Sequence, residues 1–332
     1  MLHLLLGTDW TANRDEILRR VSRDVQEEKG GRILLVPELI SHDMERRLCA
    51  AAGDTASRFA EVLSFTRLAR RVADDLGVGM EDCLDAGGRV VAMAAATRQL
   101  HSRLKAYAAV ETRPEFLTGM IDAVDEFKRC CITGPDLMQA ASETEGALAE
   151  KLQELALILE SYDALCARGK RDPRDQATLL LEQMEESDYA QNHVFYIDGF
   201  PDFTRQHMAI LEHLLRFSSE VTVSLNCDAI GSGKMAFEKA ADTAQQIFRC
   251  ARNAGVEVTV TTVKPHASAL EPLRANLFQS SVEQGCLQGQ VRARLADSAY
   301  RECLAAAEQI LELVQGGCRY RDIMVVCGDL PF

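Results

Sequence analysis

Short apolar runs alternate with helical stripes over the first 80 residues. Strands are predicted at residues 2–6, Arg32–Val36 and Glu61–Ser64. Helices are predicted at residues 14–28, 39–52 and Thr66–Leu76, from apolar residues spaced three or four apart. Continuous apolar strands that are joined by helices are typical of a parallel sheet covered on both faces. The pattern therefore predicts an α/β domain at the start of the chain.

The pattern then changes to purely helical periodicity over residues 88–187 and changes back. Strands return at Val194–Ile197, Glu220–Leu225 and Val256–Val263, with helices at 204–217 and 235–253. An irregular connection over 264–290, a helix over Cys303–Val314 and a strand over Asp322–Cys327 follow. A helical domain inserted into the α/β domain is the expected arrangement. Because the sequence stops straight after a predicted strand, we expect it to be a piece of a longer protein.

Composition and charge narrow the class of protein. The net charge of -13 argues against a protein that coats nucleic acid non-specifically, but it leaves room for a local basic groove. No apolar run is long enough for a membrane span and no signal peptide is recognisable, so a cytoplasmic protein without membrane contact is expected. The 11 cysteines include no CxxC pair, which favours buried reduced thiols over a metal site or disulfides.

A degenerate phosphate-binding loop follows the first strand. The P-loop pattern is G-x4-G-K-[ST], in which backbone amides hold phosphates, Lys neutralises them and the hydroxyl holds magnesium. Here Gly7 matches, but Ala12 replaces the second Gly, Asn13 the Lys and Arg14 the Ser or Thr. The strand–loop–helix setting is right for this loop, but the side chains that perform its chemistry are missing.

The second ATPase motif is also incomplete. Asp198 follows the strand Val194–Ile197 at the magnesium position, but Gly199 stands where the water-positioning Glu belongs. Without Lys, the magnesium hydroxyl and Glu, phosphoryl transfer lacks its main charge stabilisers. A second Gly-Lys pair at Gly231–Lys234 lacks the rest of the loop pattern and is interpreted as a turn. The remaining histidines and carboxylates form no catalytic grouping, and we expect no catalytic and no metal-binding residues.

Four blocks carry a resemblance to a known family. They are RILLVPE at Arg32–Glu38, VLSFTRLARRV at Val62–Val72, HVFYIDGFPDFT at His193–Thr204 and GGCRYRDIMVV at Gly316–Val326. In this order and at these distances they resemble the N-terminal half of AddB, one of the two subunits of the bacterial AddAB helicase–nuclease. The likeness covers nearly the whole chain.

The resemblance implies a P-loop NTPase-like, superfamily-1 helicase-like parallel sheet with an inserted all-helical domain. It implies a helicase-like domain 1A over 1–85 and 190–290, a helical domain 1B over 86–189, and the truncated start of domain 2A over 291–332. No cofactor is expected in this part: the iron–sulfur cluster and the magnesium of the nuclease would lie beyond residue 332. The expected partners are single-stranded DNA and an AddA-type subunit, which would use the ATP.

The family's DNA channel runs over the loops after the 1A strands, which implies DNA-binding roles for residues at those positions. The candidates are Ser41, Phe65, Arg67, Arg71, Phe200 and Phe203. Aromatic rings next to Arg are the combination that stacks bases and neutralises phosphates. The alternatives are core packing for the Phe rings, a solvated charge for Arg67 and a helix N-cap for Ser41. Leu39 and Arg70 depart from the family pattern, in which Gln and Trp are typical.

Three hypotheses follow from the sequence. The first is an inactivated helicase-like part of an AddB-type subunit that handles single-stranded DNA in double-strand break repair and recombination. The second is an active ATPase with an atypical loop, and the third is a purely structural scaffold that binds the AddA motor subunit.

Overall fold

The computed structural model describes residues 1–78, 83–276 and 291–328 and divides the chain into two units, Met1–His266 and Ala267–Phe332. The first unit is built on one six-stranded sheet in the order β3-β2-β4-β5-β1-β6, and every pair of neighbouring strands is parallel. The strands are β1 (Leu2–Leu6), β2 (Arg32–Leu35), β3 (Ala60–Leu63), β4 (Val194–Ile197), β5 (Val221–Leu225) and β6 (Val258–Thr262). The predicted α/β class and all six predicted strands of the sheet are confirmed.

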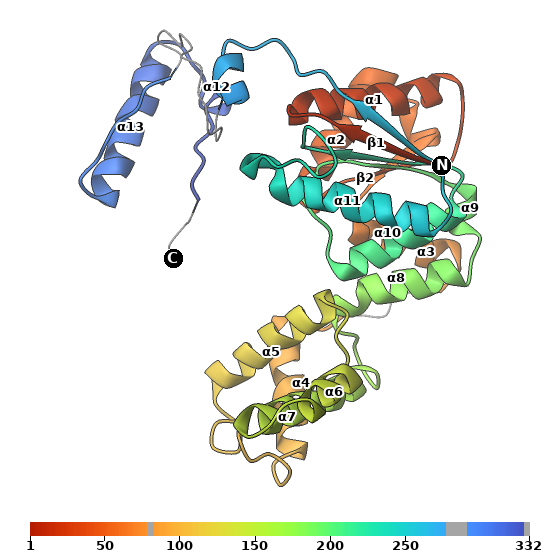
Figure 1. Ribbon diagram of the computed structural model, residues 1–332, viewed down its shortest axis with the longest axis vertical. Helices are drawn as coiled ribbons and strands as arrows, with labels where there is room; N and C mark the ends of the chain where they lie inside the picture. Colours follow the sequence, from red (N-terminus) through yellow and green to blue (C-terminus); the bar gives the residue numbers. More distant parts are fainter. Residues whose placement is uncertain (79–82, 277–290, 329–332) are drawn as a thin grey trace. The chain divides into compact units, whose positions relative to one another are not determined.

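Helices cover both faces of this sheet, as its continuous apolar strands require (Figure 1). One face carries α1 (Trp10–Gln26) and α2 (Ser41–Ala52). The other carries α3 (Phe65–Asp75), α8 (Gln176–Glu185), α10 (Arg205–Phe217) and α11 (Glu238–Asn253), with the short α9 (Tyr189–Asn192) before β4. Successive strand residues serve opposite faces, so Leu4 packs in the core under α10 whereas Leu5 packs under α1.

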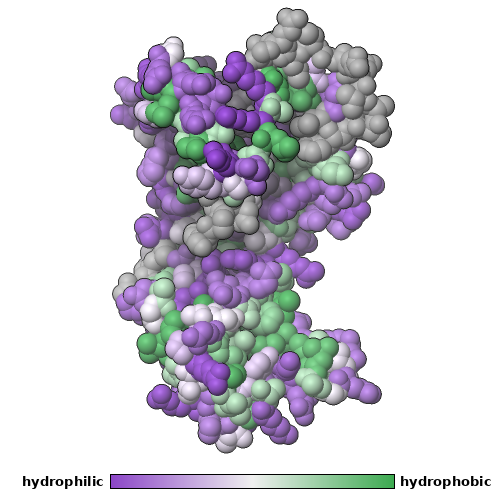
Figure 2. Space-filling model, turned by 90° about the vertical axis from the view of Figure 1, so that its left-hand side faces the viewer, coloured by the Kyte–Doolittle hydropathy of each residue, from purple (hydrophilic) through white to green (hydrophobic). Residues whose placement is uncertain are grey.

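The long helical segment contributes no strand to the sheet. Its helices α4 (Ala86–Gln99), α5 (Pro114–Arg129), α6 (Gly134–Ser142) and α7 (Ala147–Cys166) bury a core of their own. A buried ionic cluster joins α4 to α5 and to the segment after α7: Arg89 contacts Asp125 and lies 3.2 Å from Asp172. The space-filling view shows hydrophobic side chains at the surface of this helical region (Figure 2). Val91 and Leu148 are exposed hydrophobic residues of these helices.

The last helix of the segment that was expected to form the inserted domain packs on the sheet instead of on the other helices of that segment. α8 lies inside the expected range of the inserted domain, yet its Leu180 and Met184 belong to the core of the sheet. Apolar spacing identifies a buried helix face but does not say which neighbour covers that face. The spacing therefore predicted the helix but not that it packs against the sheet.

The second unit contains α12 (Glu271–Asn276) and α13 (Ala299–Gln315). α13 confirms the helix expected over Cys303–Val314, and α12 is a short helix within the stretch expected to be irregular, whose residues 277–290 lie outside the described ones. The expected strand Asp322–Cys327 is wrong: residues 320–322 form a 3-10 turn and 323–327 form no strand. A strand needs a neighbour for its backbone hydrogen bonds, and the described part of this unit offers none.

Candidate nucleotide and nucleic-acid site

The turn after β1 is short and its anion-binding amides are already used. α1 begins at Trp10, and its N-cap Asp9 accepts hydrogen bonds from the Thr11 amide at 3.0 Å and the Ala12 amide at 3.4 Å. The His266 amide donates to the same carboxylate at 2.9 Å. Partial burial raises the pKa of Asp9, but hydrogen bonds from the Thr11 hydroxyl and from these amides outweigh it and lower the pKa to about 2. A carboxylate of the chain thus lies where a helix N-terminus would hold a phosphate.

Asn13, at the position of the P-loop Lys, holds two strands together. Its side chain is only 2% exposed, and Nδ2 donates to the carbonyls of Gly7 and Leu225, each at 3.1 Å. A Cβ on Gly7 would come within 2.1 Å of Asn13 Oδ1, so this close approach requires Gly at position 7. Asn13 is uncharged and turned into the protein, and it therefore supplies no charge for a phosphate.

Arg14 places its guanidinium directly against Asp198. Arg14 Nε lies 3.1 Å from Asp198 Oδ2, and the two residues are 7% and 3% exposed. The Ser224 hydroxyl donates to the other oxygen of Asp198, and the Trp10 ring lies 4.8 Å from Arg14 Cζ. The carboxylate that would order magnesium is therefore paired with a cation of the chain.

Gly199 directly follows Asp198 and stands where the ATPase pattern has a Glu. Its φ of +83° is a conformation that residues with a Cβ rarely adopt, and a Cβ here would come within 3.0 Å of Ile40 Cδ1. The four expected positions Gly7, Asn13, Arg14 and Asp198 are brought together, with Ala12 buried in the first turn of α1. Their side chains do not fit magnesium or a nucleotide phosphate, because Asp9 and Arg14 use the groups that would bind them.

Aromatic residues gather at the carboxyl ends of β3 and β4. The Phe65 ring stacks on the His207 ring with centroids 4.0 Å apart, and it meets Phe200 edge-on at 5.4 Å. Phe203 lies 5.3 Å from Phe200. These four residues form what we call the aromatic cluster. All four are half-buried, and Phe65, Phe200 and Phe203 pack against the core of the sheet, so both the packing and the binding interpretations stay open for them.

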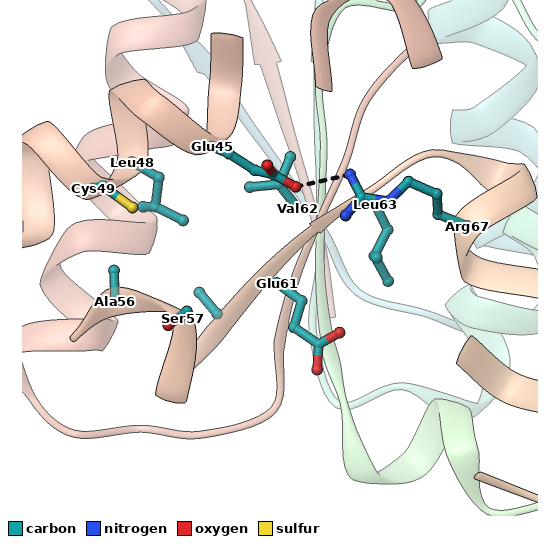
Figure 3. Close-up of a pocket in the computed structure, with 10 residues that line it drawn as sticks. Glu45, Leu48, Cys49, Ala56, Ser57, Glu61, Val62, Leu63 and Arg67 are labelled. Carbon is teal, nitrogen blue, oxygen red and sulfur yellow. Dashed lines mark hydrogen bonds and ion pairs between the residues drawn. The ribbon is translucent and has the colours of Figure 1, made fainter. Parts of the chain in front are cut away.

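The cationic candidates have partners within the chain. Arg67 Nη1 lies 2.8 Å from Glu45 Oε1 of α2, beside a cavity of about 280 Å³ at the outer strand β3 (Figure 3). Arg71 lies 3.3 Å from Glu61 and 3.0 Å from Asp75. Both pairs are partly exposed, and pairs of this kind contribute little stability.

Ser41 is buried, and its hydroxyl donates to the Glu38 carbonyl at 2.9 Å at the start of α2. The N-cap of α2 is Ile40, and Ser41 donates to a carbonyl instead of accepting from an amide, so the N-cap alternative is wrong. The DNA-binding role of Ser41 stays a prediction. Asp9 is the N-cap of α1, and an Asp directly before a helix is a signal from which that role could have been found.

Three further residues of this edge were not singled out as binding residues. Trp10 is half-exposed after β1, Leu39 is 99% exposed after β2, and His207 covers one face of Phe65. Burial lowers the pKa of His207 to about 4, against the opposing charge of Asp202, so its ring is neutral at pH 7. No sequence pattern predicts that His207 lies in this cluster, because its partner Phe65 is far away along the chain.

Comparison with known proteins assigns the chain to a family. The family model described as "ADDB, N-terminal" matches residues 4–274. The chain belongs to the AddB N-terminal family. Relatives that are named as the B subunit of an ATP-dependent helicase/deoxyribonuclease include proteins of Clostridium acetobutylicum (27% identical, 91% of this chain and 28% of the relative) and Geobacillus kaustophilus (28% identical, 98% and 30%). A relative of the same name from Thermoanaerobacter pseudethanolicus is 34% identical over 59% of this chain and 17% of its own length. The chain thus spans under a third of the length of these relatives.

Other features of this AddB chain bear on the remaining expectations. Of the ten cysteines within the described residues, only Cys166 and Cys227 are buried, so the expectation of buried thiols is wrong for most of them. Gly231 lies in a turn with φ of +69°, and Lys234 lies 2.7 Å from Asp228, so this Lys is paired with a carboxylate. Within the described residues, every helix is too short or too polar to cross a membrane.

Proposed function

We propose that this chain is the N-terminal, helicase-like part of an AddB-type subunit that guides single-stranded DNA and does not hydrolyse ATP. Its relatives are named as one subunit of an ATP-dependent helicase/deoxyribonuclease. By extension to this chain, the parent protein acts in DNA repair and recombination in the cytoplasm. An AddA-type subunit supplies the ATP-driven motor, and a nuclease with its magnesium and iron–sulfur cluster lies in the rest of the protein.

The observation that carries the inactive part of this proposal is the Arg14–Asp198 pair. Phosphoryl transfer needs a cation at the phosphates and a carboxylate that orders magnesium. Here the carboxylate pairs with Arg14, and Asp9 takes up the amides at the start of α1. The ends of β1 and β4 are separated only by β5, which is the arrangement in which the two halves of an ATP site would face each other. This relation supports a P-loop NTPase-like ancestry in which the site has become a structural contact.

The DNA-handling part rests on the carboxyl edge of the sheet. Ligands of open parallel sheets bind at this edge because loops and helix N-termini converge there. The aromatic cluster offers rings on which bases can stack, and Arg67 is a cation that can bind a phosphate in place of Glu45. The overall charge of -13 opposes binding elsewhere on the chain.

A salt titration of single-strand binding by the complex with an AddA-type subunit tests this part. We expect Arg67→Ala to weaken binding and to reduce the salt dependence by about one phosphate contact. We expect Phe200→Leu to weaken binding by about 1 kcal/mol or more, since base–aromatic stacking contributes that much. The matched control is Arg70→Ala, an exposed Arg on the same helix.

The structural-scaffold alternative has one observation in its favour, because Arg67 and Arg71 are both paired with carboxylates of the chain. If Arg67→Ala leaves affinity and salt dependence unchanged while the complex with the motor subunit still assembles, the scaffold interpretation replaces ours.

A further inference from the structure

Two helices begin beside the aromatic cluster, and their first turns are built alike. α3 begins with Phe65 and carries Arg67 two residues later, whereas α10 begins with Arg205 and carries His207 two residues later. The Phe65 and His207 rings stack on each other, with an angle of 8° between their planes. Each of these first turns therefore brings one ring to the stacked pair and also carries one Arg.

The two Arg side chains lie on different sides of the stacked pair. Residues two apart on a helix do not face each other, so a turn that directs its ring to the pair directs its Arg elsewhere. Arg67 reaches Glu45 of α2. Arg205 lies towards the end of α5, which contacts α10: burial raises the pKa of the Cys131 thiol, and the charge of Arg205 opposes this rise. The rings therefore have a cation on each of two sides.

Arg205 differs from Arg67 and Arg71 because its charge has no partner in the chain. Its side chain is exposed, and its guanidinium forms no ion pair and no hydrogen bond with any residue that the structure describes. Arg67 and Arg71 are both paired with carboxylates. The carboxylate nearest to Arg205 along the chain, that of Asp202, is paired with Lys239 instead. The guanidinium of Arg205 can therefore bind an anion without giving up a partner.

A single nucleic-acid strand has the chemistry that matches rings between two cations. Its bases stack on aromatic rings and its phosphates bind cations, and one backbone joins the two kinds of group. Phe200 and Phe203 continue the ring contacts from Phe65 along the same edge of the sheet, where open parallel sheets bind their ligands. A free phosphate needs only one cation, whereas two cations on different sides of the rings suit an anion with several phosphates.

We propose that Arg205 binds a phosphate of single-stranded DNA, on a different side of the aromatic cluster from Arg67. The strand crosses the rings with one phosphate at Arg67 and another at Arg205. This inference rests on the proposed function, because it takes the aromatic cluster as a DNA-binding surface. It adds a cation that the sequence candidates did not include.

The test is a salt titration of oligothymidylate binding by the complex with an AddA-type subunit. Each phosphate contact on a single strand contributes about 0.7 to the slope of log K against log salt concentration, so Arg205→Ala should reduce the size of the slope by about 0.7. It should also weaken binding about threefold at low salt, as expected for one exposed ionic contact. Because the two contacts are separate, the double variant with Arg67→Ala should lose about twice as much slope.

Two further variants separate the charge of Arg205 from a structural role. Arg205→Lys keeps the charge and should keep the salt dependence of the parent. Arg216→Ala removes an exposed Arg at the other end of α10 and is the matched control, which should leave the salt dependence unchanged. Since Arg205 is exposed, circular dichroism of its variants should match that of the parent.

The outcomes distinguish this inference from the proposed function. If Arg205→Ala behaves like Arg216→Ala while Arg67→Ala and Phe200→Leu weaken binding, Arg205 is a solvated charge: the inference is overturned and the proposed function stands. If Arg205→Lys loses as much salt dependence as Arg205→Ala, the charge of Arg205 does not meet a phosphate, which also overturns the inference. If Arg67→Ala, Phe200→Leu and Arg205→Ala all bind like the parent, the DNA-handling part of the proposed function fails together with the inference.

Discussion

Replacing Arg14 by Met tests whether its contact with Asp198 is a buried ion pair that stabilises the fold. Met keeps most of the length of the Arg side chain but removes the charge. The change would leave the Asp198 carboxylate, at 3% exposure, with the Ser224 hydroxyl as its remaining partner. Leaving one partner of a buried pair uncompensated costs about 3–5 kcal/mol, so we expect a loss of this size in the free energy of unfolding, measured by urea denaturation followed by circular dichroism.

A double variant that removes both charges tests the same ion pair. Arg14→Met combined with Asp198→Asn removes both charges, and we expect it to recover about 2 kcal/mol or more relative to Arg14→Met alone, because replacing both partners of a buried pair is often close to neutral. Arg19→Met is the control, since Arg19 pairs with Glu16 on the exposed side of the same helix and should cost less than about 1 kcal/mol. A loss for Arg14→Met no larger than that of the control, with no recovery in the double variant, would refute the buried-pair account.

Three more predictions concern Asp9, His207 and Glu45. The pKa of Asp9 is lowered from 3.8 to about 2, so its contribution of about 2 kcal/mol to the free energy of unfolding is present above pH 3.8 and is lost as the pH falls towards 2. Acid denaturation of Asp9→Asn should lack this loss of stability, and an acid profile unchanged from that of the parent chain would contradict the prediction. The pKa of His207 is lowered from 6.5 to about 4, so the free energy of unfolding should fall by about 3 kcal/mol as the pH drops from 6.5 to 4. The variant His207→Phe keeps a ring against Phe65 and should not show this fall in urea denaturation at matched pH. Glu45→Gln releases Arg67 and should tighten single-strand binding by the complex at low salt, whereas no change would indicate that Arg67 does not meet phosphate.

The strands of the sheet could be predicted from the sequence because each is a short, continuous apolar run that needs cover on both faces. The strand at Asp322–Cys327 has the same character and was wrongly predicted, because an apolar run does not reveal whether another strand lies beside it. α8 was assigned to the helical insertion for a similar reason, since Leu180 and Met184 show a buried face but not its neighbour.

That the side chains of the ATPase motifs are absent after β1 and β4 could be identified from the sequence. What replaces them could not, because Arg14 and Asp198 are 184 residues apart and only the parallel order β1-β5-β4 brings them together. The pairing of Arg67 with Glu45 was hidden for the same reason, as the two residues lie on helices that follow different strands.

The most direct test of the central claim uses Trp10, the single tryptophan of the chain, whose ring lies against Arg14 at the proposed inactive nucleotide site. Its fluorescence is followed while magnesium and ATP are added to the purified chain, with and without single-stranded DNA. Because Asp9 and Arg14 already use the groups that would bind phosphate and magnesium, we expect no saturable change in emission and no release of phosphate. A saturable, magnesium-dependent change that is accompanied by ATP turnover would contradict the account.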